Sequence, residues 1–505
     1  MTFPLLTFLG LIPLVGAGVL CLPVKQIARG VGMVFALVTA VVGIAVAVVY
    51  AGGGAADLAE KSAWIPQFGA WWAIGVDGMA LVMVLLTVLL VPVVLLAEWK
   101  VPGRDRWTPQ VFFALVLALE SLSLFVFMAQ DVLLFYLFFE ATLIPMYFLI
   151  GGFGGPRRAY AAVKFLLFSL GGGLIMLASV IGLYAVSVQL TGAPTYLLSE
   201  LSQLQIDPML GRWLMVGFLV AFIVKAPMVP VHTWLPTAAE ESTPGTSVLL
   251  VGILDKIGTF GMIKFCLWLF PEASTWVAPA MVVLALISIL YGAIAAIGST
   301  NLLRLVAYTS ISHFGFMVLG IYTFTSAGIS GSIFYMVNHG FSTAALFLVI
   351  GFLISRRGSA LVADYGGVQK VAPVLSGVFL MAGLSGLALP GMSSFVSEFM
   401  VLAGTWSRQP GVAAVATLGT VLAAVYILRM YQRTMTGPVT DEVARTFTTD
   451  ATAREKWVAA PVLAVILLLG FAPNLALGVI EPVAQSTMSH VGVSDPVAPL
   501  GEEAK

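Results

Sequence analysis

Ten ionisable side chains interrupt long apolar runs of this sequence, and their types suit proton transfer. They are Glu120, Glu140, Lys164, Lys225, Asp255, Lys256, Lys264, His313, His339 and Glu398. A charge at the centre of a bilayer costs roughly 2.5 to 3.5 kcal/mol on the insertion scale, so such residues are normally functional. Burial moves the titration of lysine and carboxyl groups toward neutral pH, and histidine already titrates there. We therefore expect a hydrated proton relay whose members are Glu140, Lys225, Lys256, His313, His339 and Glu398.

A purely structural role is the competing interpretation for some of these charges. Polar side chains can join helices by hydrogen bonds or extend to the membrane interface. This role suits Glu120 and Lys264 best, and it fits Lys164 and Asp255 as well as a supporting role in the relay does.

Metal and cofactor binding have little support in the sequence. A sodium or divalent-metal site needs clustered carboxylates and carbonyls, and no such cluster is present, although backbone oxygens at helix breaks remain candidates. Cys21 and Cys266 stand alone, which leaves disulfide frameworks, zinc fingers and four-thiolate clusters without ligands. His313 and His339 could ligate a haem, as in a b-type cytochrome, or could simply bond between helices.

Prolines predict that two of the charged helices are broken. Lys225 lies shortly before Pro227 and Pro230 in an apolar run, and Pro390 comes shortly before Glu398. Each proline removes a backbone donor and clashes with the preceding turn, so each helix should break beside its charge. Two interrupted helices in corresponding halves are typical of transporters that have inverted repeats and an ion site at mid-membrane.

The elements that must position these residues are membrane-spanning helices. The chain is 60% hydrophobic and 10% charged, with a mean hydropathy of +1.03. This composition excludes a water-soluble fold, a nucleic-acid binder with a basic face and a disordered scaffold. Because a span needs roughly 20 apolar residues, we expect an all-α polytopic membrane protein. Its spans, about fourteen, centre near residues 2–22, 30–50, 76–97, 109–129, 131–150, 161–188, 212–230, 246–269, 276–297, 302–323, 328–354, 373–404, 411–428 and 458–480.

The distribution of Lys and Arg predicts the orientation. One set of alternate loops holds sixteen of them: Lys25, Arg29, Lys100, Arg104, Arg106, Arg157, Arg158, Arg304, Arg356, Arg357, Lys370, Arg429, Arg433, Arg445, Arg454 and Lys456. The other set holds Lys61, Arg212, Arg408 and Lys505. Cationic loops resist translocation, so the first set should be cytoplasmic and both termini should lie outside. The first apolar run lacks a basic leading region and is not expected to be a cleaved signal.

Equal spacings predict an internal repeat. Glu140 and His313, Lys225 and Glu398, and Lys256 and Arg429 are each 173 positions apart. A shift of 173 residues maps each predicted helix onto the helix five places further along the chain. Because five is an odd number, the second copy would cross the membrane in the opposite direction to the first. We therefore expect two inverted five-helix repeats, each with a broken helix, at 109–270 and 271–430. Three helices at 1–108 would precede them, and a cytoplasmic loop, a last helix and a tail at 431–505 would follow.

Three motifs carry a resemblance to a known family. They are Lys225-Ala-Pro-x-x-Pro-x-His-x-Trp-Leu-Pro, Gly245-Thr-Ser-Val-Leu-Leu-Val-Gly-Ile-Leu-x-Lys256-x-Gly and Leu389-Pro-Gly-x-Ser-Ser-Phe-Val-Ser-Glu398-Phe. They closely resemble the antiporter-like membrane subunits of proton-pumping NADH:quinone oxidoreductase, respiratory complex I. The likeness extends over essentially the whole chain. Glu398 differs from the sister subunits L and N, which usually carry lysine there.

The resemblance implies roles for individual residues. It makes Glu140 the fifth-helix glutamate that pairs with Lys225, Lys256 the central connecting lysine, and Glu398 part of the terminal proton path. It makes His313 and His339 the histidines of the central axis, and Lys164, Asp255 and Arg429 are expected to support this set.

It also implies the surroundings of the chain. No cofactor is expected in this chain, whereas FMN, iron–sulfur clusters and quinone are expected in partner subunits. The expected partners are other complex I membrane subunits, especially L and N and the lateral helix of L, together with the lipid bilayer and no nucleic acid. The expected location is a bacterial inner membrane. A Mrp-type cation/proton antiporter and membrane hydrogenases share the fold and remain alternatives.

One loop departs from the family pattern. The family commonly has Leu-Pro-Asp-Ala and an Ala-Pro-Thr run after the first break, whereas this chain has Leu235-Pro-Thr-Ala and Glu240-Glu-Ser-Thr-Pro244. The glycine-rich run Gly151 to Gly155 precedes two arginines and is expected to be a cytoplasmic turn rather than a phosphate loop. Gly171 to Gly173 lies within a span and should allow close helix packing.

Overall fold

The computed structural model describes residues 4–23 and 25–496, and the chain is an all-α polytopic membrane protein with one small β-hairpin. Residues 2 and 3 of the first predicted span, and the tail 497–505 with Lys505, lie outside the described residues. The N-terminal part comprises α1 (Leu5–Val19), α2 (Ala28–Ala51), η1 (Gly54–Asp57), β1 (Ala59–Ile65), η2 (Pro66–Phe68), β2 (Ala70–Gly75) and α3 (Gly78–Ala97).

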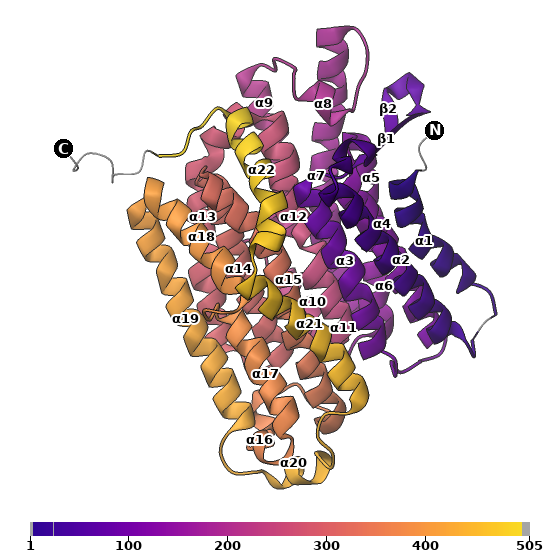
Figure 1. Cartoon of the computed structure of the whole chain (residues 1–505), viewed down its shortest axis with the longest axis vertical. Helices are drawn as coiled ribbons and strands as arrows, with labels where there is room; N and C mark the ends of the chain where they lie inside the picture. Colours follow the sequence, from indigo (N-terminus) through magenta and orange to yellow (C-terminus); the bar gives the residue numbers. More distant parts are fainter. Residues whose placement is uncertain (1–3, 24, 497–505) are drawn as a thin grey trace.

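The middle of the chain forms a bundle around several interrupted helices (Figure 1). Its uninterrupted helices are α4 (Pro109–Met128), α7 (Arg158–Thr191), α13 (Pro271–Gly298), α14 (Leu302–Tyr322) and α15 (Ser326–Arg357). The shorter pieces are α5 (Val132–Ala141), α6 (Leu143–Phe153), α8 (Leu198–Leu201), α9 (Pro208–Lys225), α10 (Trp234–Glu241), α11 (Pro244–Leu249), the π-helical turn η3 (Leu250–Leu254), α12 (Lys256–Gly261) and the π-helical turn η4 (Met262–Leu267).

The C-terminal part completes the bundle. Its elements are η5 (Val362–Asp364), α16 (Val368–Val371), α17 (Pro373–Gly386), α18 (Ser393–Arg408), α19 (Pro410–Met435), α20 (Asp441–Thr446), α21 (Ala453–Phe471) and α22 (Asn474–Val491). Figure 1 shows α16 and α20 at one end of the bundle and the β-hairpin at the other.

Each predicted span coincides with helix, but the number of spans is not confirmed. Within residues 4–23 and 25–496, ten helices are long and apolar enough to cross a membrane, or eleven if α21 and α22 form one bent span. The 66° bend between these two helices corrects the prediction of a continuous span over 458–480. Two shorter apolar helices, α1 and α17, fall below that length.

The β-hairpin was not predicted from the sequence. Antiparallel strands β1 and β2 pair Ala59 with Gly75 and Lys61 with Ala73. The buried carboxylate of Asp131, which caps α5 by accepting from Leu134 N at 2.9 Å, also accepts from Trp71 N at 3.0 Å. The hairpin is therefore attached to the bundle through a helix N-cap.

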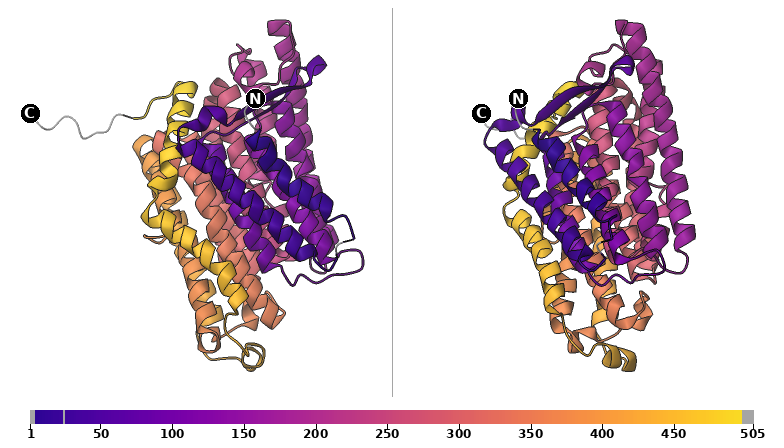
Figure 2. Two further views of the ribbon diagram at one scale, coloured as in Figure 1. Left: turned by 45° about the vertical axis from the view of Figure 1, so that its right-hand side comes forward. Right: turned by 90° about the vertical axis from the view of Figure 1, so that its right-hand side faces the viewer.

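Burial separates a central set of helices from a peripheral set. The apolar windows of α14 and α15 are 89% buried, whereas those of α2 and α19 are 33% buried. In the two views of Figure 2, α1 and α2 line the outside of the bundle. Two of the predicted relay residues, His313 and His339, lie on the central helices α14 and α15.

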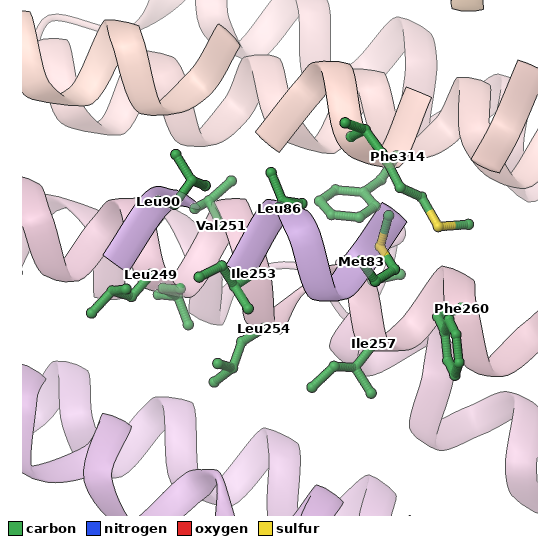
Figure 3. Packing of buried hydrophobic residues seen from close by; sticks show 14 of the residues in the cluster. Met83, Leu86, Leu90, Leu249, Val251, Ile253, Leu254, Ile257, Phe260 and Phe314 are labelled. Carbon is green, nitrogen blue, oxygen red and sulfur yellow. The ribbon is translucent and has the colours of Figure 1, made fainter. Parts of the chain in front are cut away.

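The core seals the space around the interrupted helices. Figure 3 shows Met83, Leu86 and Leu90 of α3 packed near Val251, Ile253 and Leu254 of η3, with Ile257, Phe260 and Phe314 beside them. Burying such a side chain contributes about 1.5 to 3 kcal/mol. This apolar packing holds the irregular backbone around Lys256 in place.

The two predicted breaks are present, but they do not align at the predicted repeat spacing. One helix breaks between α9 and α10 and the other between α17 and α18, beside Pro227, Pro230 and Pro390. Lys225 is the last residue of α9, before its break, whereas Glu398 lies within α18, after its break. A shift of 173 residues therefore does not superimpose the breaks, and the two-repeat division stays a prediction.

Candidate functional site: a buried series of ionisable side chains

Lys225 lies where α9 ends. The backbone turns away at Ala226, and the indole Nε1–H of Trp234, from α10, donates to the Val224 carbonyl at 3.1 Å. Gly258 of α12 packs against this end so closely that an added Cβ would lie 2.5 Å from Ala226 N. The break therefore frees backbone groups that specific neighbours satisfy.

Aromatic rings surround the Lys225 ammonium group. Its Nζ lies 5.0 Å from the ring centre of Phe139 and 5.8 Å from that of Phe165, within cation–π range. Lys225 is 1% exposed, and among the described residues its Nζ forms no hydrogen bond. The direct pair with Glu140 that the resemblance implied is therefore not formed in this structure. Glu140 instead packs against Gly173, where an added Cβ would overlap its carboxylate.

Asp255 and Lys256 follow the π-helical turn η3. Asp255 N bonds to Leu250 O, five residues back, at 3.0 Å, and Lys256 Nζ donates to Val251 O at 2.9 Å. The widened turn thus gives a backbone carbonyl to a lysine side chain. Both residues are fully buried, and among the described residues the Asp255 carboxylate accepts no hydrogen bond.

Lys256 joins the central helix α15. Its Nζ lies 2.6 Å from His339 Nδ1 and 4.5 Å from the ring centre of Phe314. When Lys256 is charged, its ammonium donates to Nδ1, and the ring proton of a neutral His339 then lies on Nε2. This Nε2–H forms no hydrogen bond to a described residue, so it can donate to a water molecule.

His313 continues the series toward α18. Its ring centre is 5.2 Å from that of His339, and its Nδ1 lies 2.6 Å from the Tyr335 hydroxyl. Tyr335 donates to Glu398 Oε2 at 2.8 Å, and Thr420 donates to Glu398 Oε1 at 2.5 Å.

The hydrogen-bond directions along this stretch are consistent with one another. Since the hydroxyl of Tyr335 donates to the carboxylate of Glu398, it accepts from His313 Nδ1–H. His313 Nε2 is then the acceptor, and the Tyr426 hydroxyl lies 3.5 Å from it. Donors and acceptors alternate from His313 to Glu398, which is the arrangement that stepwise proton transfer requires.

Four other predicted residues lie apart from this series. Lys264 forms an ion pair with Asp77 at 2.6 Å, and Lys164 donates to Thr237 at 3.1 Å. Glu120 is 1% exposed, with no hydrogen-bond partner among the described residues. Arg429 is exposed on α19 and is not brought to the buried series.

The sequence analysis missed Tyr335, Thr420 and Tyr426, which carry hydroxyl groups. A signal for one of them was present, because Tyr335 precedes His339 by four positions and so shares its helix face. The other two lie on α19, where Tyr426 precedes the predicted Arg429 by three positions.

The geometry does not fit a haem between the two histidines. Both Nδ1 atoms are hydrogen-bonded, the ring centres are 5.2 Å apart, and Phe314 lies 5.4 Å from His339. A macrocycle has no space between these packed rings. Across residues 4–23 and 25–496, no group of three or more His, Cys, Asp or Glu side chains could hold a metal ion.

Comparison with known proteins defines the class. Residues 129–423 match the family described as NADH:quinone oxidoreductase/Mrp antiporter, transmembrane. The chain belongs to this family. Within it, the chain is 48% identical to NADH-quinone oxidoreductase subunit M of Mycobacterium tuberculosis, over 98% of this chain and 95% of that protein. It is 36% identical to subunit M of Rhodobacter capsulatus, over 84% of this chain and 83% of that protein.

Solved structures agree on the fold. A chain of respiratory complex I from Thermus thermophilus matches with a TM-score of 0.87 and 31% identity, covering 96% of this chain and all of that one. A chain of the Mrp complex from Dietzia matches with a TM-score of 0.83 at 22% identity, covering 97% of this chain and all of that one, which shows a shared fold alone.

Proposed function

We propose that this chain is the proton-translocating subunit M of the membrane arm of an NADH:quinone oxidoreductase. Its charges would move protons while the redox chemistry takes place in other subunits. The chain is 48% identical over almost its full length to a protein of that name, which supports this assignment.

One observation carries the mechanism: three short contacts join titratable groups across four helices. Lys256 Nζ and His339 Nδ1 are 2.6 Å apart, as are His313 Nδ1 and the Tyr335 hydroxyl, and Tyr335 lies 2.8 Å from Glu398. Each contact is within the range for proton transfer along a hydrogen bond. The open step is between the two histidines, where a water molecule or a ring rotation would complete the path.

Glu140 and Lys225 form the other part of the proposed path. The ammonium of Lys225 is held by aromatic rings rather than by a carboxylate, so a small movement can bring it toward Glu140 or Asp255. A change of partner would change which group holds the proton. Lys164 and Asp255 support this part, whereas the exposed position of Arg429 gives it no direct role.

The surroundings follow from the same assignment. The chain would work as a non-redox subunit in a bacterial plasma membrane, with the cation-rich loops in the cytoplasm and both termini outside. FMN, iron–sulfur clusters and quinone would belong to partner subunits. Subunits L and N and the lateral helix of L would be its neighbours in the membrane.

Lys256→Ala in the assembled complex tests the mechanism, with Lys264→Ala as the matched control. Lys264 lies on the same helical run but pairs with Asp77 outside the series. NADH-driven acidification of membrane vesicles should fall about tenfold or more in Lys256→Ala only, because proton transfer by a placed group contributes at least that much. Undiminished pumping by an assembled Lys256→Ala complex would overturn the mechanism.

Purification of the native chain tests the assignment to a complex. We expect it to co-purify with subunits that oxidise NADH. Purification with other antiporter subunits and without NADH oxidation would favour the Mrp-type alternative.

A further inference from the structure

The loop that departs from the family pattern forms a compact ionic contact at the end of α10. Glu241 is the last residue of this helix, and its side chain is buried. Its carboxylate accepts from Arg157 N at 2.8 Å and from Arg157 Nε at 3.0 Å. Its carbonyl accepts from Gly155 N at 2.7 Å.

Glycines in the turn before α7 permit this contact. An added Cβ at Gly154 would overlap the Glu241 carbonyl, and one at Gly155 would lie 2.8 Å from Glu241 Oε2. The glycine-rich turn that the sequence analysis singled out therefore receives a carboxylate of this chain.

Glu240 connects the same turn to a more distant helix. Its Oε2 lies 3.0 Å from Arg304 of α14, and its Oε1 lies 3.6 Å from Arg157. Arg304 also donates to Tyr308 at 3.3 Å. Glu240 thus links α14, in the second predicted repeat, to the α6–α7 turn in the first.

A third contact lies on the same side of α10. Thr237 stands where the family commonly has aspartate, and its hydroxyl accepts from Lys164 of α7 at 3.1 Å. Glu240 follows Thr237 by three positions, so both side chains lie on one face of the helix. This chain therefore has an acidic residue, Glu240, about one helical turn after position 237. Glu240 pairs with two arginines, whereas Thr237 contacts one lysine.

Helix α10 transmits these contacts to the first break. Trp234, at its other end, donates to the Val224 carbonyl at 3.1 Å and packs on Phe165 at 5.4 Å between ring centres. Phe165 is one of the two rings that hold the Lys225 ammonium. A displacement of α10 therefore moves both the backbone and the aromatic neighbours of Lys225.

We propose that Glu240 and Glu241 form an ionic clamp with Arg157 and Arg304 that fixes α10 and thereby positions Lys225. They are positioning residues, since neither touches Lys225. Through α10, the clamp joins α14 to the turn between α6 and α7. Its link to proton movement rests on the proposed function, whereas its mechanical role does not.

Glu240→Gln in the assembled complex tests the clamp, with Glu272→Gln as the matched control. Glu272 also forms a partly exposed pair with an arginine on another helix, Arg212, at 3.3 Å, away from α10. Amide hydrogen exchange across residues 232–245 should quicken about fivefold in Glu240→Gln and not in Glu272→Gln, as expected for loss of a modest ionic contact.

Further variants separate the clamp from a general loss of packing. Glu240→Asp keeps the charge and should restore slow exchange in part. Arg304→Gln combined with Glu240→Gln should quicken exchange by less than the two single effects together, because the contact between these two residues can be lost only once. Unchanged exchange in Glu240→Gln, or fully additive effects in the double variant, would overturn the clamp.

Proton pumping provides the second measurement. Glu240→Gln should lower pumping severalfold. The difference from wild type should become smaller at high ionic strength, because salt screens the partly exposed clamp of the wild type. Faster exchange with normal pumping would overturn the positioning of Lys225 and leave the proposed function intact. Normal pumping by Lys225→Ala would overturn the proposed function and leave the clamp to be judged by exchange alone.

Discussion

Tyr335 is the residue that turns separate charges into a connected series. Its hydroxyl bonds both His313 and Glu398, which lie on different helices. Charges such as Lys225 and Lys256 could be predicted because they are expensive in an apolar run. A tyrosine in the same run is not expensive, since its ring packs like other aromatic residues. Sequence reasoning therefore finds the charged residues of such a path more readily than the neutral tyrosines that connect them.

Tyr335→Phe should lower NADH-driven pumping about tenfold or more, because the ring still fills its site but no hydroxyl carries a proton to Glu398. Acidification of vesicles that hold the assembled complex measures this. Tyr365→Phe is the control, since Tyr365 is also buried and its hydroxyl donates to Ser359 O at 2.6 Å outside the series. Equal pumping by the two variants would contradict the role of Tyr335.

At the scale of elements, breaks were predictable and helical irregularities were not. Proline removes a donor, so Pro227, Pro230 and Pro390 indicated the two breaks. The π-helical turns η3 and η4 leave no such signal, because hydropathy does not depend on which carbonyl an amide bonds. The β-hairpin was missed for a related reason. The sequence was divided into apolar runs long enough to span a membrane, and β1 and β2 are much shorter than such a run.

Gly258→Ala should destabilise the chain by about 1 to 3 kcal/mol, the usual cost of an extra carbon in a tight core. The added Cβ would meet Ala226 N at 2.5 Å and Phe222 O at 2.6 Å, where the neighbour is backbone and yields little. Thermal unfolding of the purified complex measures the change. Gly171→Ala is the control, because nothing lies within 4 Å of its added carbon. Equal unfolding temperatures for the two variants would contradict close packing at the break.

Across the whole molecule, contacts at one end tie α15, the central helix of the series, and α3 to the start of α21. Arg356, at the end of α15, bonds both carboxylate oxygens of Glu455 at 2.6 and 2.8 Å. Arg454 donates to Ala97 O, at the end of α3, at 2.9 Å. The charge pattern assigns these arginines to one set of loops but does not predict which pairs form, because pairing depends on how the loops fold over the helix ends. The helix that carries His339 is thus held at one end by the last loop.

Asp450 of this loop anchors the helix that leads to the second break. Its carboxylate accepts from Val374 N at 2.9 Å and Leu375 N at 3.0 Å, in the first turn of α17, and from Ala451 N at 2.7 Å. Partial burial works to raise the pKa of Asp450, but these backbone N–H groups outweigh it, and the pKa is lowered from its usual value.

Asp450→Asn should therefore lower the unfolding temperature at neutral pH and have little effect in acid. A carboxyl with a lowered pKa stabilises the fold fully above its unfolded pKa, about 3.9, and this stabilisation is lost as pH falls through the folded pKa. The difference between wild type and variant should be constant from about pH 5 to 8 and shrink below about pH 4. Thermal unfolding of the purified complex across this range measures it, with Asp57→Asn, an exposed residue, as the control. A difference that persists undiminished at the acid end would show that Asp450 acts through packing rather than through its charge.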